Sequence, residues 1–258
     1  MKCKKLRIIL LGFLTVIFAV SAFHVAKITI DYKRADEANA ALQAQFVQEI
    51  EPSTAPSADP ADAPTTAPTT GEERPAVPIR VDFDGLMQKN SDIVGWLYCP
   101  DTPINYPVVK GKDNSQYLRT DLEGKYLVGG TLFADYRNGD FGKDANYIVY
   151  GHNMRNLTMF GTLAKYKSQA YYDAHPVLYF LTPEGNYIIE LFAGAVVKRD
   201  SAIYQPAPKA STISDIIAKS TFRSTSALTE GDSIITLSTC SYEFNNARYV
   251  LLGRLIEI

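Results

Sequence analysis

The sequence is poor in the residues that most often carry chemistry, with three cysteines and three histidines among 258 residues. It contains no HxxH, HExxH or CxxC spacing, which argues against a zinc site. The P-loop and GxGxxG patterns of nucleotide-binding proteins and the GxSxG elbow of serine hydrolases are also missing. The net charge is −2 and no basic run follows the first residues, so nothing points to nucleic-acid binding. We therefore expect no metal and no cofactor.

The first seven residues, MKCKKLR, carry four basic side chains and no acidic one. Residues 8–26 follow and are apolar apart from a few Ser, Thr and His residues, close to the ~20 that a helix needs to cross a bilayer. The basic flank predicts a cytoplasmic N-terminus, with everything after about residue 30 outside the cell. We expect 1–30 to form a cytoplasmic tail and membrane anchor. A signal peptide cleaved near 20–22 is the alternative interpretation.

The next part of the chain changes composition twice. Residues 31–50 are rich in Ala, Glu and Gln, which favours a helical stalk. Beyond them a proline recurs at every fourth position: Pro52, Pro56, Pro60, Pro64 and Pro68. Such a segment cannot bury a core and favours extended conformations, which over 52–78 span up to roughly 80 Å. We expect 31–80 to be a stalk and tether, followed by one domain at 81–258.

Short runs rich in Val, Ile, Tyr, Phe and Leu recur between turn residues in this domain and predict eight strands. The predicted strands cover residues 94–98, 104–109, 131–134, 146–150, 177–181, 186–197, 233–239 and 247–257. Helical patterns are fewer and lie at about 82–90, 114–119, 157–174 in pieces, and 211–222. Many short strands with few helices favour a mainly β fold with a closed or nearly closed barrel, and a β-sandwich is the alternative.

Two of the cysteines fall in the domain that we expect to be exported, where a Cys99–Cys240 disulfide is one interpretation. Cys99 has no basic neighbour close in sequence, which is typical of an inert, packed thiol. Cys240 ends a β-branched strand, and Arg248 stands near the start of the next. If the two strands pair antiparallel, these side chains lie close together. A guanidinium beside a thiol favours the thiolate, and beside a carbonyl under attack it stabilises the oxyanion.

A cysteine nucleophile needs a proton-transfer partner, and His152 and His175 are the histidines beyond the apolar segment. His152 follows an apolar strand and a glycine in NYIVYGHNMRN, so we expect it at a strand end. His175 precedes Pro176, and a residue before proline is held in extended geometry, which favours a turn or packing role. We therefore predict that His152 is the partner of Cys240.

At these residues the sequence resembles a sortase, and more closely a class B sortase. The resemblance lies in TLSTC with an arginine eight residues on, YGHNM around His152, GGTLFADYRN at 129–138 and the AHPVLYF stretch, and it extends over 81–258. It implies an eight-stranded sortase-type barrel with N-terminal helices and a helix in the connection before the cysteine strand. Residues 81–90 and 211–222 can supply these helices.

The resemblance also implies a cysteine transpeptidase. Cys240 would attack the Thr carbonyl of an NPQTN- or NPxTG-like sorting signal, His152 would protonate the leaving amine, and Arg248 would hold the carbonyl or oxyanion. A peptidoglycan precursor or cell-wall amine would then release the acyl-enzyme. The positions similar to substrate-groove residues are Ser238, Asn114 and Leu118. The chain has no DPF- or DPW-like lid upstream of the barrel, which favours wall anchoring over pilus assembly.

Two alternatives stay open at this point. A cysteine peptidase would share the nucleophile and the acyl-enzyme and differ only in using water as the acceptor. A non-catalytic exported adhesion module would instead use Cys99 and Cys240 as a disulfide.

Overall fold

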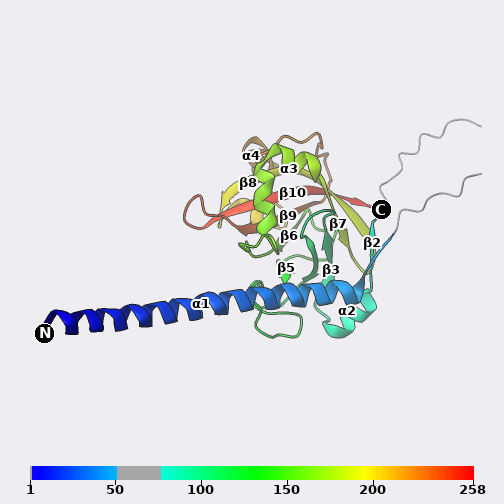
Figure 1. Ribbon diagram of the computed structural model, residues 1–258. Coiled ribbons are helices and arrows are strands. Elements are labelled where there is room, and N and C mark those ends of the chain that lie inside the picture. Colours follow the sequence, from blue (N-terminus) through cyan, green and yellow to red (C-terminus); the bar gives the residue numbers. More distant parts are fainter. Residues whose placement is uncertain (1, 51–76) are drawn as a thin grey trace, which may run out of the picture.

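The computed structural model describes residues 2–50 and 77–258. Helix α1 (Lys2–Phe46) is continuous over 45 residues. Its N-terminal part projects well clear of the rest of the protein (Figure 1). Beyond Leu10 the helix includes an exposed window with a mean hydropathy of 1.9, long and apolar enough to cross a membrane. By length and composition, α1 is compatible with a single-pass anchor or with a signal sequence.

The folded domain is a closed barrel of eight strands. They are β3 (Ile93–Tyr98), β4 (Asn105–Val109), β5 (Leu132–Ala134), β6 (Asn146–Tyr150), β7 (Val177–Leu181), β8 (Asn186–Lys198), β9 (Ile234–Cys240) and β10 (Ala247–Glu257). Around the barrel the order is β10-β8-β7-β3-β4-β5-β6-β9, and β9 pairs back to β10. The pairs β4–β5 and β6–β9 are parallel and the others antiparallel. The barrel is therefore confirmed, each predicted strand end lies within one residue, and the sandwich alternative is wrong.

Alternate side chains of these strands point inward and fill the barrel. Leu97, Phe180 and Leu237 have no exposed surface and belong to one apolar cluster. Phe141, from the β5–β6 connection, stacks on Phe180 with ring centroids 4.0 Å apart. Burying each such side chain stabilises the fold by about 1.5–3 kcal/mol, and closure of the sheet leaves no unpaired strand edge.

Short helices decorate the barrel: α2 (Phe83–Lys89), η1 (Gly161–Lys167), α3 (Gln169–Ala174), η2 (Ala202–Tyr204) and α4 (Ala210–Ala218). They confirm three of the four predicted helical regions. The helix predicted at 114–119 is wrong, because this segment forms turns. There the Asp113 carboxylate accepts hydrogen bonds from the backbone N–H groups of Ser115 and Gln116, at 2.8 and 2.9 Å. This side chain offers the backbone an alternative to helix.

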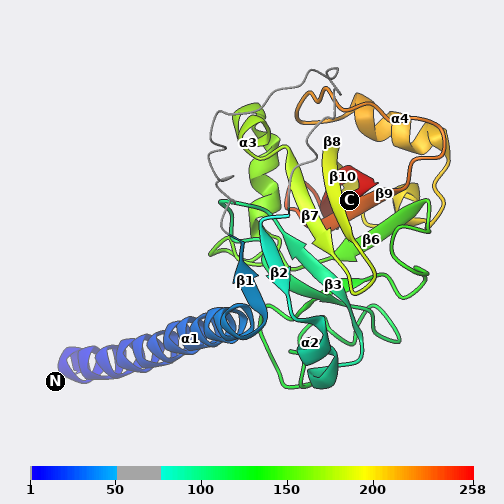
Figure 2. The ribbon, with the colours of Figure 1, turned by 90° about the vertical axis from the view of Figure 1, so that its right-hand side faces the viewer.

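Two further strands, β1 (Val47–Glu49) and β2 (Ile79–Val81), were not expected from the sequence. They pair antiparallel, with Glu49 opposite Ile79, and flank the proline-rich segment (Figure 2). Most of the predicted tether, residues 51–76, lies outside the described residues. The strands on either side of this segment pair with each other, so its length does not set the distance between α1 and the barrel.

The C-terminal part of α1 packs against the domain. Phe46 is 5 % exposed and shares an apolar cluster with Ile79 and Leu86. Gln43 donates a hydrogen bond to the carbonyl of Asn105 at the start of β4, at 2.8 Å. Residues 31–46 are thus helical and lie against the barrel rather than standing apart from it.

Candidate active site

The parallel pairing of β6 with β9 places two of the predicted site residues at one end of the barrel. Tyr150 pairs with Ser238 in this register. His152 and Cys240 each lie two residues further along their own chain segment, so both leave the sheet at the same edge. The backbone N–H of Gly151 continues the pairing by donating to the Ser238 carbonyl at 3.1 Å. His152 therefore follows the end of β6, and Cys240 ends the neighbouring strand β9.

The antiparallel pairing of β9 with β10 adds the arginine. Arg248 is the register partner of Cys240, so the predicted juxtaposition is confirmed. One Nη1 hydrogen of Arg248 is donated to the carbonyl of Ala247, at 2.9 Å. Directly paired residues point to the same face of a sheet, so the guanidinium and the thiol share one side. This face opens into the cleft described next.

A cleft of about 590 Å³ lies at this end of the barrel. All six residues that the sequence predicted for the site line it: Asn114, Leu118, His152, Ser238, Cys240 and Arg248. Cys240 is partly exposed, whereas Ser238 is 2 % exposed. The hydroxyls of Ser238 and Tyr204, on η2, lie 2.8 Å apart. The cleft thus brings the predicted catalytic and groove residues together.

Gly151 permits the chain to place His152 at the cleft. A Cβ atom here would lie 2.4 Å from Leu132 Cδ2 and 2.7 Å from Phe160 Cδ2. Any side chain would therefore push the segment out of the barrel. The glycine before the histidine is required by this close approach.

The His152 ring is oriented by the backbone. Its Nε2 donates to the carbonyl of Leu118 at 2.7 Å, so the neutral ring carries its proton on Nε2. Burial lowers the pKa of His152 below its ordinary value of 6.5; the bond to Leu118 acts in the opposite direction, and the charge of Arg119 lowers it further. His152 is therefore neutral in the free protein at neutral pH.

Asn153 is a contact that the sequence did not single out. Its Nδ2 donates to the carbonyl of Cys240 at 2.7 Å. The residue after His152 is thus tied directly to the residue that carries the thiol. The YGHNM motif contains this asparagine, but its partner becomes visible only when β6 and β9 are paired.

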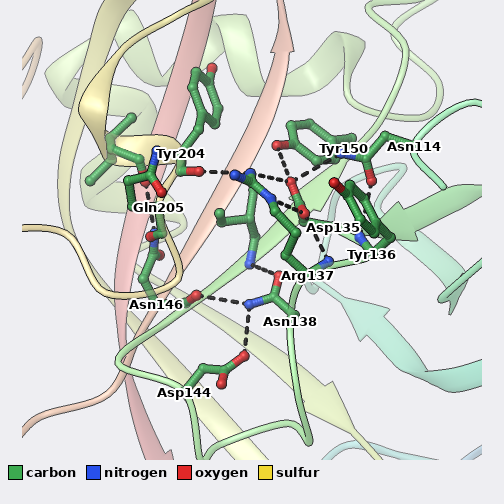
Figure 3. Close-up of polar contacts among 12 residues, drawn as sticks. Asn114, Asp135, Tyr136, Arg137, Asn138, Asp144, Asn146, Tyr150, Tyr204 and Gln205 are labelled. Atoms are coloured by element: carbon green, nitrogen blue, oxygen red, sulfur yellow. Dashed lines mark hydrogen bonds and ion pairs between the residues drawn. The ribbon is translucent and has the colours of Figure 1, made fainter.

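A second set of missed residues lies behind the cleft wall. Asp135 is fully buried and accepts hydrogen bonds from Asn114, Arg137 and Tyr150 (Figure 3). Arg137 and Tyr150 also line the cleft. Asp135 and Arg137 belong to the GGTLFADYRN stretch, which the sequence marked only as part of a family resemblance.

The other cysteine and the other histidine of the barrel domain, Cys99 and His175, lie outside the cleft. Cys99 and Cys240 are both free thiols, so the predicted alternative of a disulfide between them is wrong. Cys99 is buried in the barrel core with its Sγ 3.7 Å from the Tyr166 hydroxyl, and burial raises the pKa of its thiol. His175 follows α3, where its ring stacks on Tyr171 with centroids 4.4 Å apart. Neither residue lines the cleft.

Metal chemistry has no visible ligand set in the described part of the chain. Among residues 2–50 and 77–258, no three His, Cys, Asp or Glu side chains gather where they could hold a metal ion.

Comparisons with known proteins agree with this geometry. A family model described as the sortase domain matches residues 97–256. Sortase B of Listeria monocytogenes is 35 % identical over 185 residues, covering 69 % of this chain and 75 % of the relative. The solved Staphylococcus aureus sortase B–substrate complex has a TM-score of 0.64 at 31 % identity and covers 68 % of this chain and 85 % of that one. Sortase B from B. anthracis in complex with AAEK1 has a TM-score of 0.69 at 28 % identity, covering 89 % and 100 %.

The barrel, the cleft that joins a cysteine, a histidine and an arginine, and these relatives lead to one assignment. The chain belongs to the sortase family and is a class B sortase, a cysteine transpeptidase that anchors proteins to the cell wall.

Proposed function

We propose that this protein is a membrane-anchored sortase that cleaves an NPQTN- or NPxTG-like sorting signal after its threonine. The acyl group is then transferred to an amine of the cell wall. The observation that carries the proposal is the register of β6, β9 and β10, which brings His152, Cys240 and Arg248 to one cleft. A relative of 31 % identity has been solved as a sortase B–substrate complex, which supports peptide binding in this cleft.

Acylation begins at the cysteine. Neutral His152 takes the proton of the Cys240 thiol, the resulting thiolate attacks the threonine carbonyl carbon, and the Arg248 guanidinium stabilises the oxyanion that forms. Collapse of this intermediate breaks the peptide C–N bond and leaves a thioester on Cys240. His152, as imidazolium, gives its proton to the departing amine.

Release reverses these roles. An incoming amine attacks the thioester, neutral His152 accepts its proton, and the thiolate of Cys240 leaves as the new amide forms. Water competes at about 55 M, so an amine prevails only when the cleft holds it in attacking geometry, for which effective molarities reach ~10⁵ M or more.

The anchor belongs to the same proposal. The basic N-terminal flank and the apolar part of α1 support an N-terminus in the cytoplasm and a catalytic domain outside the cell. Ser238, Asn114 and Leu118 line the cleft and are proposed to contact the sorting signal. Wall-type amines and secreted surface proteins are then the partners.

The test is a product analysis with the full-length protein in detergent micelles. Peptides containing NPQTN or NPxTG are incubated with and without wall-type amines, and products are identified by mass spectrometry. We expect slow hydrolysis without amine and a new amide with it. Free acid as the sole product at saturating amine would favour the peptidase alternative, and no turnover of any peptide by the wild type would refute the proposed signals. The Cys240→Ala variant is the negative control.

A further inference from the structure

Asp135 is a buried carboxylate that the catalytic steps above do not use. It follows β5 and its side chain has no exposed surface. Arg137 meets it with two bonds, Nε to Oδ1 and Nη2 to Oδ2, both 2.8 Å. The Tyr150 hydroxyl and the Asn114 amide also donate to Oδ2, at 2.8 and 3.1 Å. A buried charge is tolerated when it is paired and hydrogen-bonded in this way.

The partners of Asp135 come from separate walls of the cleft. Asn114 belongs to the turn segment after β4, Tyr150 ends β6, and Arg137 also donates to the carbonyl of Tyr204 in η2, at 2.8 Å. These four residues line the cleft, and Asp135 stands behind them. Figure 3 shows the side chains of Asn114, Arg137 and Tyr150 converging on the one carboxylate, while Arg137 also reaches the backbone carbonyl of Tyr204. A single anion thus joins three segments that are distant in sequence.

The bonds also fix which atoms face the cleft. The Asn114 amide is held at both ends, because its Oδ1 accepts the backbone N–H of Tyr136 at 3.0 Å. The Tyr204 hydroxyl continues the chain to Ser238 Oγ, two residues before the nucleophile. The wall therefore presents oriented polar groups to a bound peptide.

The protonation states agree with this arrangement. Burial by itself would raise the pKa of Asp135, but hydrogen bonds from Arg137, Tyr150 and Asn114 lower it to about 2. Burial and the neighbouring Asp135 charge raise the pKa of Tyr150. The carboxylate stays ionised and the phenol stays protonated across the physiological range, so the bonds persist.

We propose that Asp135 and Arg137 are positioning residues that set the shape of the peptide-binding cleft by fixing Asn114, Tyr150 and Tyr204. This inference rests on the proposed function of the cleft and deepens it. Asp135 acts on peptide affinity through its neighbours, whereas Arg137 also lines the cleft itself; in the described part of the chain neither is hydrogen-bonded to the Cys240 thiol or the His152 imidazole. Its loss should affect KM more than the reactivity of Cys240.

The experiment compares Asp135→Asn and Arg137→Lys with a matched control, Asp144→Asn. Asp144 is another carboxylate of the β5–β6 connection, bonded to Asn138 Nδ2 and Gly139 N at 2.8 and 2.7 Å, and it does not line the cleft. Thermal unfolding of each full-length variant reports folding. Arg137 is 35 % exposed, so Arg137→Lys folds even if the buried Asp135→Asn does not.

Five quantities are measured: kcat and KM for an NPQTN peptide, the binding of this peptide to each variant in a Cys240→Ala background, the rate of Cys240 alkylation by iodoacetamide, and amide hydrogen exchange. We expect KM and the peptide Kd to rise about tenfold in Asp135→Asn and Arg137→Lys, the scale of one lost hydrogen bond. Alkylation should stay within about twofold, and exchange should accelerate at 112–120 and 199–206. Asp144→Asn should leave KM and exchange at these segments unchanged.

Unchanged KM and exchange in folded Asp135→Asn and Arg137→Lys would overturn the positioning role. So would an equal rise of KM in Asp144→Asn, which would mark a general loss of stability. Hydrogen exchange requires no substrate, so accelerated exchange in a protein that binds no NPQTN peptide would uphold the positioning role and refute only the proposed signal.

Discussion

At the scale of single residues, the partly buried imidazole of His152 is expected to set the pH range of activity. Because the pKa of His152 lies below 6.5, its ring becomes a cation only at lower pH, and a cationic ring cannot take the proton of the nucleophile. We expect kcat/KM to rise with pH through a midpoint below 6.5. The measurement is kcat/KM against pH for one sorting-signal peptide. An acid limb centred at or above 6.5 would contradict a His152 ring that is neutral at neutral pH.

The two histidines of the domain offer a matched pair. His152→Ala should abolish turnover and leave the barrel folded, because the proton donor and acceptor is gone. His175→Ala removes a stacking contact with Tyr171 far from the cleft and should cost stability at most. Turnover and thermal unfolding are measured for both variants. Equal loss of activity in two folded proteins would show that the choice between them was unfounded.

A substitution at Arg248 tests whether the proposed reaction requires the planar guanidinium group or only a positive charge. Arg248→Lys keeps the positive charge opposite Cys240 but loses the planar fork of donors. We expect kcat/KM to fall by ~10²–10³, the usual cost of one oxyanion donor. Arg199→Lys, at another cleft-lining arginine, is the control and should change kcat/KM far less. Near-normal turnover by the Arg248→Lys variant would reduce the arginine to a generic cation.

At the scale of elements, the sequence predicted the barrel strands well because each is a compact apolar run between turn residues. The short strands β1 and β2 escaped, since three residues beside a proline-rich segment show no periodicity. The helix expected at 114–119 failed because Asp113 caps a turn there. Long strands can be predicted from the local sequence pattern, whereas the formation of short elements depends on tertiary contacts.

The candidate site divides in the same way. Cys240 and Arg248 belong to consecutive strands, so their pairing followed from sequence spacing. His152 meets them only through the parallel β6–β9 pair, whose partners Asn146 and Ile234 are far apart in the chain. The hydrogen bonds that join Asp135 and Arg137 to the cleft wall could not be predicted from the sequence, because Arg137 binds the carbonyl of Tyr204, which lies on a different connection.

The packing of α1 against the folded domain predicts that residues before position 81 contribute to the stability of the domain. Phe46 is 5 % exposed and packs with Ile79 and Leu86, so Phe46→Ala should destabilise the protein by about 3 kcal/mol. Ile50, which is 50 % exposed, provides the control, and Ile50→Ala should change stability little. Urea unfolding of both variants is the measurement.

A protein that begins at residue 81, the predicted domain boundary, should be less stable than one that begins at 31.

At the scale of the whole molecule, one helix joins the apolar segment to the domain. Tyr32, packed against the core cluster, lies six residues beyond Ala26, so if α1 is the proposed anchor, a rise of about 1.5 Å per residue predicts a domain close to the membrane surface. Removing ten residues within 51–76 should leave the distance between the domain and the membrane surface unchanged. The distance is measured by energy transfer between labelled lipid and a dye attached at Lys209→Cys, in a Cys3→Ser, Cys240→Ala background. A shorter distance after the deletion would mean that the segment acts as a tether.

Orientation is tested separately. Protease added to intact, wall-stripped cells should digest the domain after residue 30 and spare an N-terminal tag. Digestion of the tag with protection of the domain would reverse the assignment.

The pairing of β1 with β2 also bears on what happens if the backbone is cut. Glu49 and Ile79 stand opposite each other, and Phe46 is enclosed by residues from beyond the segment. A single cleavage between 51 and 76 would divide the polypeptide without separating its parts, because strand pairing and apolar packing still join them. The severed enzyme should run as two bands under denaturing conditions and as one particle otherwise. The same logic makes this site a natural place to express the anchor and the catalytic fragment as two polypeptides that reassemble.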